Sequence, residues 1–200
     1  LSVCGYPPRD FLEFDDFIRR VNDAITQLAA ATQGFAILVG APTRNPLPEG
    51  KDLFNSAYFL ADGQVRHIRH KTLLPTYDIF DEYRYFEPSH HFEIIEYRGK
   101  RLAVTICEDL WNVGNENPLY TVCPMDEMMA QNPDLMLNLS ASPFSYAHAE
   151  DRMHVLRTNV QRYNLPLFYC NQVGAQTEVI FDGGSVVMSP NGNVFDEMPY

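Results

Sequence analysis

The sequence predicts an α/β domain in which helices cover the faces of a β-sheet. Hydrophobic residues make up 46% of the 200 positions and aromatic residues 12%, which suffices for a globular core and argues against disorder. Short β-branched runs alternate along the chain with longer segments of helical periodicity. There is no internal repeat, low-complexity tract or linker, so residues 1–200 are predicted to form one domain.

The N-terminal third is predicted to form one long helix followed by three strands. Asp10 can cap a helix over residues 11–33, and Gly34 ends it. Residues 35–40 read as a buried strand and residues 42–51 as a polar loop. The turn pair at positions 62 and 63 then favours a hairpin, because Asp-Gly fits tight antiparallel connections. The apolar helix positions are Phe14, Phe17, Ile18, Val21, Ile25 and Leu28, and the hairpin strands are residues 55–60 and 64–68.

Strands and helices also alternate in the rest of the chain. Residues 71–91 contain two prolines and many aromatic residues but no clean period, so we expect a long irregular segment there. Segments of this kind in compact domains are often functional. The elements expected after it are a hairpin of residues 92–97 and 101–106, a helix over 125–130, a strand over 135–139, a helix over 147–163, a strand over 167–171, and short strands over 179–181, 185–188 and 193–195.

Charge and cysteine content exclude several classes of protein. The 15 basic and 26 acidic residues give a net charge of −11, which opposes nucleic-acid or anionic-lipid binding through a basic face. No apolar stretch approaches the roughly 20 residues of a membrane helix. The four cysteines, at positions 4, 107, 123 and 170, form no C-x-x-C pair, so neither a zinc ribbon nor a disulfide framework is predicted. A cytoplasmic location is expected.

Metal and phosphate sites are not indicated either. The histidines at 67 and 70, and those at 90 and 91, lack nearby cysteines or an H-E-x-x-H pattern, so we expect surface residues. The pair Gly183-Gly184 lacks the spacing and the following lysine of a phosphate-binding loop. No metal site and no phosphate-binding loop are therefore expected in this chain.

Cys107 is the first candidate catalytic residue. It follows the β-branched run of residues 101–106, and Glu108 and Asp109 after it suit a first helical turn. At such a strand end, backbone N–H groups point toward the sulfur and favour the reactive thiolate. The alternative is a buried, inert thiol, which is the usual state of a free cysteine.

Lys71 is a candidate for activating that thiol. It lies where a strand-like stretch gives way to the irregular segment. A lone lysine is normally a solvated surface charge, so the other motifs decide its role. A cysteine–histidine pair also stays open, although none of the six histidines lies in a recognisable protease context.

An ordered set of motifs runs along the chain. The motifs are residues 5–10, 70–77, 80–86, 106–111, 138–144, 171–174 and 181–185. Together they resemble the carbon-nitrogen hydrolase (nitrilase) superfamily, and within it the glutaminase domains of glutamine-dependent NAD synthetases. The resemblance spans nearly the whole chain and implies an α-β-β-α sandwich, truncated at both ends, with a Glu-Lys-Cys triad.

The resemblance implies roles for individual residues. Cys107 is the nucleophile, and Lys71 is the cation that stabilises the tetrahedral intermediate. Glu82 matches a second glutamate of the family, which positions the lysine or helps to transfer protons. The general-base glutamate is expected immediately before Leu1, and the isolated 200 residues are therefore expected to be inactive. Much the same truncation is expected beyond Tyr200.

Substrate recognition is expected from three further residues. Glutamine carries an ammonium and a carboxylate group, so its pocket needs an acid and hydrogen-bond donors. Glu108 is the candidate for the ammonium group, and Tyr77 and Ser142 lie in segments with which the family lines its pocket. Their alternative roles are, respectively, helix N-terminal charge, aromatic packing and a turn hydroxyl.

The function implied is hydrolysis of the glutamine amide through a cysteine thioester. The ammonia would pass to a C-terminal synthetase domain of the same polypeptide, where alone ATP and magnesium are expected. A homo-oligomer is also implied. The alternatives are a stand-alone nitrilase-family amidase acting on another amide, and a non-catalytic interaction module in which Cys107 is core packing.

Overall fold

The fold is that of a computed structural model, which describes residues 1–146 and 148–199. The chain divides into two compact units, Leu1–His90 and His91–Tyr200, and each is described by itself. Two expected positions, Ala147 at the start of the second long helix and Tyr200 at the end of the chain, lie outside the described residues. The one-domain organisation stays a prediction.

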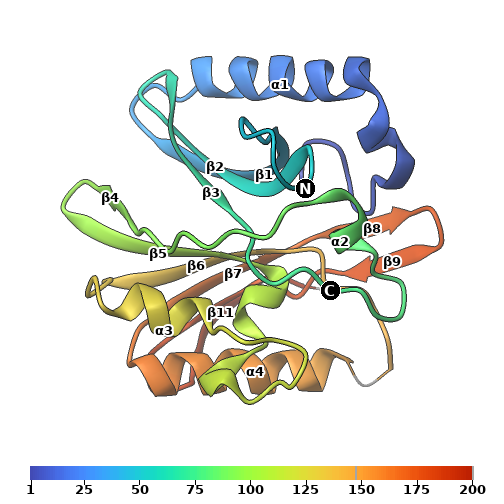
Figure 1. Cartoon of the computed structure of the whole chain (residues 1–200). Coiled ribbons are helices and arrows are strands. Elements are labelled where there is room, and N and C mark those ends of the chain that lie inside the picture. The colour runs from blue at the N-terminus through green and yellow to red at the C-terminus, as the bar shows by residue number, and fades with distance from the viewer. Residues whose placement is uncertain (147, 200) are drawn as a thin grey trace. The chain divides into compact units, whose positions relative to one another are not determined.

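The first unit is a three-stranded antiparallel sheet with a helix on one face (Figure 1). Its core joins residues of helix α1 to the central strands, because α1 turns an apolar stripe toward the sheet. The elements are η1 (Arg9–Glu13), α1 (Asp15–Ala30), β1 (Ala36–Arg44), β2 (Leu53–Ala61), β3 (Gln64–His70) and α2 (Glu82–Tyr85), and the sheet order is β1-β2-β3.

The long helix expected over residues 11–33 is wrong in its first part. The backbone of Phe14 is extended, with φ −94° and ψ 117°, and this separates a 3₁₀ helix from α1. Phe14 is therefore 60% exposed instead of packing on the sheet, and Leu28 is also exposed. The buried positions of α1 are Ile18, Val21, Ile25 and Ala29.

The strands of the first unit follow the sequence pattern closely. Asp62 and Gly63 both have positive φ, 53° and 78°, as a type I′ hairpin turn requires. The loop expected over residues 42–51 is shorter than predicted, because β1 continues through Pro42. Pro42 pairs with Asn55 across the sheet. Proline is tolerated there because β1 lies at a sheet edge.

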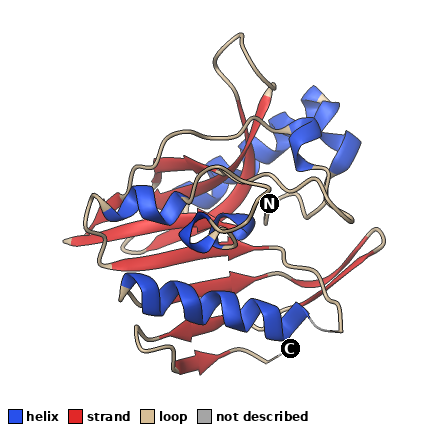
Figure 2. Cartoon of the chain, turned by 60° about the horizontal axis from the view of Figure 1, so that its bottom comes forward, coloured by secondary structure: helices blue, strands red, loops and turns tan. Residues whose placement is uncertain are grey.

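The second unit is a six-stranded mixed sheet with helices α3 and α4 packed on one face (Figure 2). Strands β5, β6 and β7 are parallel, and their neighbours are antiparallel. The elements are β4 (Ile95–Tyr97), β5 (Lys100–Ile106), η2 (Cys107–Leu110), η3 (Val113–Asn115), α3 (Pro124–Met129), β6 (Leu135–Ser140), α4 (His148–Tyr163), β7 (Leu167–Asn171), β10 (Val186–Met188) and β11 (Val194–Glu197), with the hairpin of β8 (Val173–Gln176) and β9 (Val179–Asp182).

The carboxyl ends of the three parallel strands, β5, β6 and β7, lie at one edge of this sheet. Cys107 follows β5, Ala141 follows β6 and Gln172 follows β7. Strand β8 was not expected from the sequence, since a glycine interrupts its short run. No helix in the described part of the chain is long and apolar enough to cross a membrane.

Candidate active site

Cys107 occupies a strained elbow between β5 and η2. Its φ is +47°, a left-handed conformation that residues with a side chain rarely adopt. The Asp109 carboxylate accepts a hydrogen bond from the Ile106 backbone N–H at 3.0 Å and closes the turn. The turn is a four-residue 3₁₀ helix, shorter than the helical start expected from the sequence. The thiol is only partly buried and so differs from a packed core cysteine.

Asn159 of helix α4 forms a hydrogen bond to the elbow. The side-chain Nδ2 of this buried residue donates to the Leu110 carbonyl at 2.9 Å and to the Val155 carbonyl at 2.9 Å. Sequence reasoning missed Asn159. Its one signal was a polar residue within the buried stripe of α4, beside Leu156 and Val160.

Glu108 is buried in the first turn of η2, next to the nucleophile. This position also fits its alternative role as a helix N-terminal charge, and binding of the ammonium group stays a prediction. One carboxylate oxygen accepts a hydrogen bond from the Tyr120 hydroxyl at 2.9 Å. Buried acids are rare unless paired, so this side chain is suited to bind a cation.

The loop after β6 places Ser142 in a hydrogen-bonded frame. Its backbone N–H donates to Asn171 Oδ1 at 2.8 Å, and its hydroxyl lies 2.9 Å from His148 Nε2. Arg152 lies 3.5 Å from the same hydroxyl and forms a two-point ion pair with Asp182, at 3.0 and 3.1 Å. Ser142 is thus more than a surface turn hydroxyl.

His148 stands between this loop and the elbow. Its ring stacks on Trp111, one position beyond η2, with 5.2 Å between ring centroids. Burial, together with the Arg152 guanidinium, lowers the pKa of His148. The imidazole is therefore neutral at physiological pH, and its Nε2 shares one hydrogen bond with the Ser142 hydroxyl.

Polar side chains near the ends of β5 and β6 form a chain of hydrogen bonds close to the elbow. Asn138 Nδ2 donates to Thr105 Oγ1 at 2.9 Å, and the Ser140 hydroxyl donates to Asn138 Oδ1 at 2.7 Å. Tyr169 pairs with Asn138 in the next strand. Burial, and next the charge on Cys107, raise the pKa of Tyr169, so its phenol stays protonated beside the thiol.

In the first unit, Lys71 and Glu82 form a buried ion pair. Lys71 Nζ lies 2.6 Å from Glu82 Oε2, and the lysine side chain is only 1% exposed. The alternative that Lys71 is a solvated surface charge is therefore wrong. The segment of residues 71–82 is anchored by a hydrogen bond from the Glu82 backbone N–H to the Pro75 carbonyl at 3.1 Å.

Tyr77 is 41% exposed, and its ring meets Phe80 edge-on at 5.5 Å. This geometry fits the aromatic-packing alternative, and a role in substrate binding stays a prediction. Within the first unit, the structure therefore pairs Lys71 with Glu82 but gives Tyr77 a separate aromatic partner.

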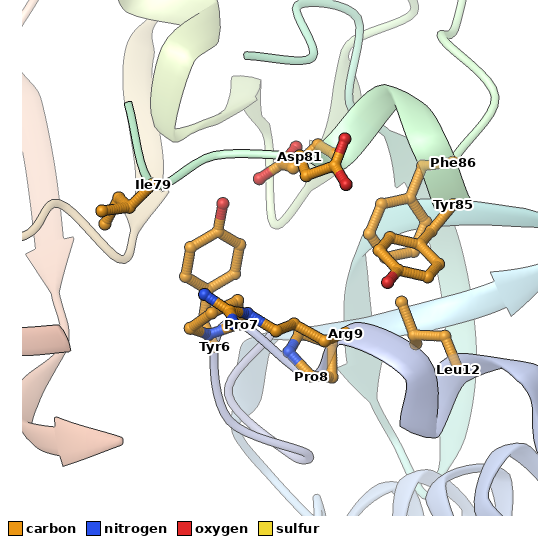
Figure 3. A pocket seen from close by; sticks show the side chains of 10 residues that line it. Tyr6, Pro7, Pro8, Arg9, Leu12, Ile79, Asp81, Tyr85 and Phe86 are labelled. Carbon is orange, nitrogen blue, oxygen red and sulfur yellow. The ribbon is translucent and has the colours of Figure 1, made fainter. Parts of the chain in front are cut away.

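A small cavity of about 30 Å³ lies beside Glu82, between η1 and α2 (Figure 3). A volume of this size admits a few water molecules at most. Burial and the hydrogen bond to Asp10 raise the pKa of Tyr85, at the cavity wall, to about 12. The cavity is lined by Tyr6, Pro7, Pro8, Arg9, Leu12, Ile79, Asp81, Glu82, Tyr85 and Phe86.

The histidine pairs do not build a metal centre. Across residues 1–146 and 148–199, no group of three or more His, Cys, Asp or Glu is arranged to hold a metal ion. His70 is only half-buried, stacks on Phe54 with 4.2 Å between centroids, and its Nδ1 lies 2.7 Å from the Ser56 hydroxyl.

Comparisons with known proteins identify the family of this chain and its relatives. Residues 1–199 match the carbon-nitrogen hydrolase family. The chain is 39% identical to the glutamine-dependent NAD(+) synthetase of Synechocystis sp., covering 100% of this chain and 37% of that protein. The solved glutamine-dependent NAD+ synthetase of Acinetobacter baumannii, in complex with ADP, superimposes with a TM-score of 0.85 at 32% identity, covering 98% of this chain and 35% of the other.

A third comparison concerns the fold alone. A mutant of the Nesterenkonia AN1 amidase, from the nitrilase superfamily, superimposes with a TM-score of 0.78 at 20% identity, covering 98% of this chain and 69% of the amidase. The nitrilase-like fold class expected from the sequence is therefore confirmed. The chain spans about a third of the length of the two synthetases compared above. By its sequence match and its fold, the chain belongs to the carbon-nitrogen hydrolase family and is homologous to the glutaminase domain of glutamine-dependent NAD synthetases.

Proposed function

We propose that this domain hydrolyses the side-chain amide of glutamine through a thioester on Cys107. The observation that carries the proposal is the buried Lys71–Glu82 pair, 2.6 Å apart. Burying two charges opposes folding unless they are well paired, and hydrophobic residues of similar size often serve stability equally well. A buried ion pair in a carbon-nitrogen hydrolase is therefore best explained by chemistry.

The reaction proceeds in two balanced steps. The Cys107 sulfur bonds to the amide carbon while its proton passes through a general base to the leaving nitrogen, so that the C–N bond breaks and ammonia departs. Water then adds to the thioester carbon, which releases glutamate and restores the thiol. Lys71 stabilises the negative oxygen in both tetrahedral intermediates, and Glu82 holds that lysine or moves protons. No metal or organic cofactor takes part in this domain.

Three side chains are proposed to recognise glutamine. Glu108, buried and bonded to Tyr120, binds the α-ammonium group of the substrate. Ser142 offers its hydroxyl from the frame of Asn171 and His148. Tyr77 contributes an exposed aromatic ring.

The proposal extends to the partners of the domain. The ammonia is passed to a synthetase domain of the same polypeptide, which alone uses ATP and magnesium. This extension is supported by the names of the relatives, which are glutamine-dependent NAD(+) synthetases. The protein works in the cytoplasm as a homo-oligomer, and light scattering of the full-length protein would measure its mass.

The test uses the full-length protein and measures ammonia released from glutamine. Wild type is expected to show a γ-glutamyl adduct on Cys107 by rapid-quench mass spectrometry, and Cys107→Ala is expected to lose at least about 10⁴-fold in rate. Cys170→Ala is the matched control, because this exposed thiol lies in the same unit. Glutamine hydrolysis retained in Cys107→Ala would overturn the proposal.

Two further measurements separate the alternatives. Faster hydrolysis of simple aliphatic amides than of glutamine would favour a stand-alone amidase. In an NAD-forming assay, Cys107→Ala should lose activity with glutamine but keep it with added ammonium. Equal activity of wild type and variant with glutamine would contradict ammonia supply by this domain.

A further inference from the structure

Asn55 is a buried polar residue, without a role in the proposed chemistry, that touches both members of the ion pair. Its backbone oxygen accepts a hydrogen bond from the Lys71 backbone N–H at 2.8 Å. Its side-chain Nδ2 lies 3.5 Å from Glu82 Oε2, the same oxygen that lies 2.6 Å from Lys71 Nζ. One carboxylate oxygen is thus held between a cation and an amide donor.

The charge of Glu82 fixes the orientation of the Asn55 amide. The opposite orientation would place Oδ1 against a carboxylate oxygen, and two acceptors repel each other. In the orientation observed, Asn55 Oδ1 is buried without a hydrogen-bond partner among residues 1–146 and 148–199. A buried acceptor without a partner opposes folding. Folding therefore does not explain an asparagine that is only 3% exposed at this position.

We propose that Asn55 is a positioning residue whose side-chain N–H fixes the Glu82 carboxylate, which in turn aims the ammonium group of Lys71. This inference rests on the proposed function, in which Lys71 stabilises the oxyanion. The 3.5 Å separation is long for an N–H···O bond, as catalytic hydrogen bonds often are before substrate binds. Without this donor, the carboxylate can rotate, and Lys71 loses its fixed direction.

Two substitutions separate positioning from packing. Asn55→Leu keeps the approximate size of the side chain and removes the donor. Its kcat should fall by about 100-fold, because small displacements of catalytic groups have effects of that order, while KM changes by less than about threefold. Asn55→Asp keeps the shape but opposes a second carboxylate to Glu82. The two acids then share a proton, and the acid limb of the pH–rate profile should move up by about one pH unit or more.

Thr32→Val is the matched control in the same unit. Thr32 is fully buried, its hydroxyl donates to the Ala29 carbonyl at 2.6 Å, and it accepts from the Gly63 N–H at 3.2 Å. This variant should lower the melting temperature, because it removes buried hydrogen bonds, with kcat changed by less than about twofold. A kcat of Asn55→Leu as high as that of the control, or an unshifted pH profile in Asn55→Asp, would overturn the proposal. If Asn55→Leu does not fold, Asn55→Ala, which also lacks the donor, takes its place.

A measurement without substrate keeps this inference distinct from the proposed function. At a fixed pH, the ¹³C chemical shift of the Glu82 carboxyl carbon should change in Asn55→Leu and not in Thr32→Val, because only the first variant loses the amide donor. An unchanged chemical shift would overturn the role of Asn55 even in an active enzyme. A changed chemical shift in a protein whose wild type is inactive on glutamine would overturn the proposed function and leave the contact of Asn55 with Glu82 standing. The charged group paired with Glu82 is Lys71, and the other titratable groups of the adjoining cavity are Tyr6, Arg9, Asp81 and Tyr85.

Discussion

At Cys107 the demands of reactivity and of backbone stability oppose each other. Only glycine adopts a φ of +47° without strain, yet a nucleophile needs a side chain. The surrounding contacts, among them the Ile106–Asp109 bond, hold the residue in this conformation. The local strain is thus part of the site, as at other functional positions.

Replacing Cys107 by glycine should therefore stabilise the protein relative to its alanine variant. Both variants lack the thiol, but only Cys107→Gly relaxes the left-handed backbone. We expect a difference in unfolding free energy of about 1 kcal/mol in favour of glycine. Urea denaturation of the two variants measures it, and equal midpoints would show that the elbow is unstrained.

His148 should make the protein less stable in mild acid. Because burial and Arg152 lower its pKa, the folded state binds a proton less readily than the unfolded chain, whose value is about 6.5. The contribution of His148 to the unfolding free energy is complete above a pH of about 6.5. It declines as the pH falls below that value and levels off below the pKa of the folded state.

The unfolding free energy of wild type should therefore fall more steeply than that of His148→Gln between pH 7.5 and pH 5.5. Glutamine keeps a hydrogen-bonding side chain at Ser142 but does not titrate. His154→Gln, exposed on the same helix, should follow the wild-type curve. Parallel curves for wild type and His148→Gln would contradict the assignment.

At the scale of elements, helix α4 supports the catalytic turn as well as covering the sheet. Its Asn159 reaches the carbonyl of Leu110, the last residue of η2, while Leu156 and Val160 fill the core beside it. The position of the nucleophile therefore depends on a helix about 50 residues further along the chain.

Asn159→Leu should loosen the elbow without emptying the core. Loss of the bond leaves the buried Leu110 carbonyl without its donor, which should lower stability by about 1–3 kcal/mol and slow alkylation of Cys107 by iodoacetamide. Thr158→Ala removes a comparable but exposed bond, to the His154 carbonyl, and should do neither. An unchanged alkylation rate in Asn159→Leu would show that α4 does not position the thiol.

Local sequence signals predicted most elements correctly. The hairpin of β2 and β3 was predictable because Asp62-Gly63 encodes its own turn, and β7 because its apolar run matches one strand. The break at Phe14 was not, because nothing in its neighbourhood opposes a continuous helix. There the exposed aromatic residue follows the backbone and not the apolar period.

The site was predictable as a set of residue types but not as contacts. Cys107 at a strand end and Lys71 before an irregular segment are local features. The bonds of Asn159 to Leu110 and of Asn55 to Glu82 join positions 49 and 27 residues apart, and no local pattern encodes them. Burial of Lys71 also depends on the folded unit, since lysine alone favours water.

At the scale of the whole molecule, the net charge of −11 produces self-repulsion that salt should relieve. The melting temperature of the protein should rise as NaCl increases from about 0.02 to about 0.3 M, over which the Debye length falls below 10 Å. Differential scanning calorimetry measures the change. A melting temperature that is constant or falls over this range would show that favourable ion pairs outweigh the repulsion.

The buried ion pair of the first unit also restricts how the protein can vary by mutation. Removal of Glu82 alone leaves the ammonium group of Lys71 inside the protein without its counter-charge, and removal of Lys71 alone strands the carboxylate. Either single change is more harmful than an apolar replacement of both residues together. The two positions are therefore expected to change together during evolution. Loss of the catalytic function through these positions passes through a single variant that is less stable than either the starting protein or the apolar double variant.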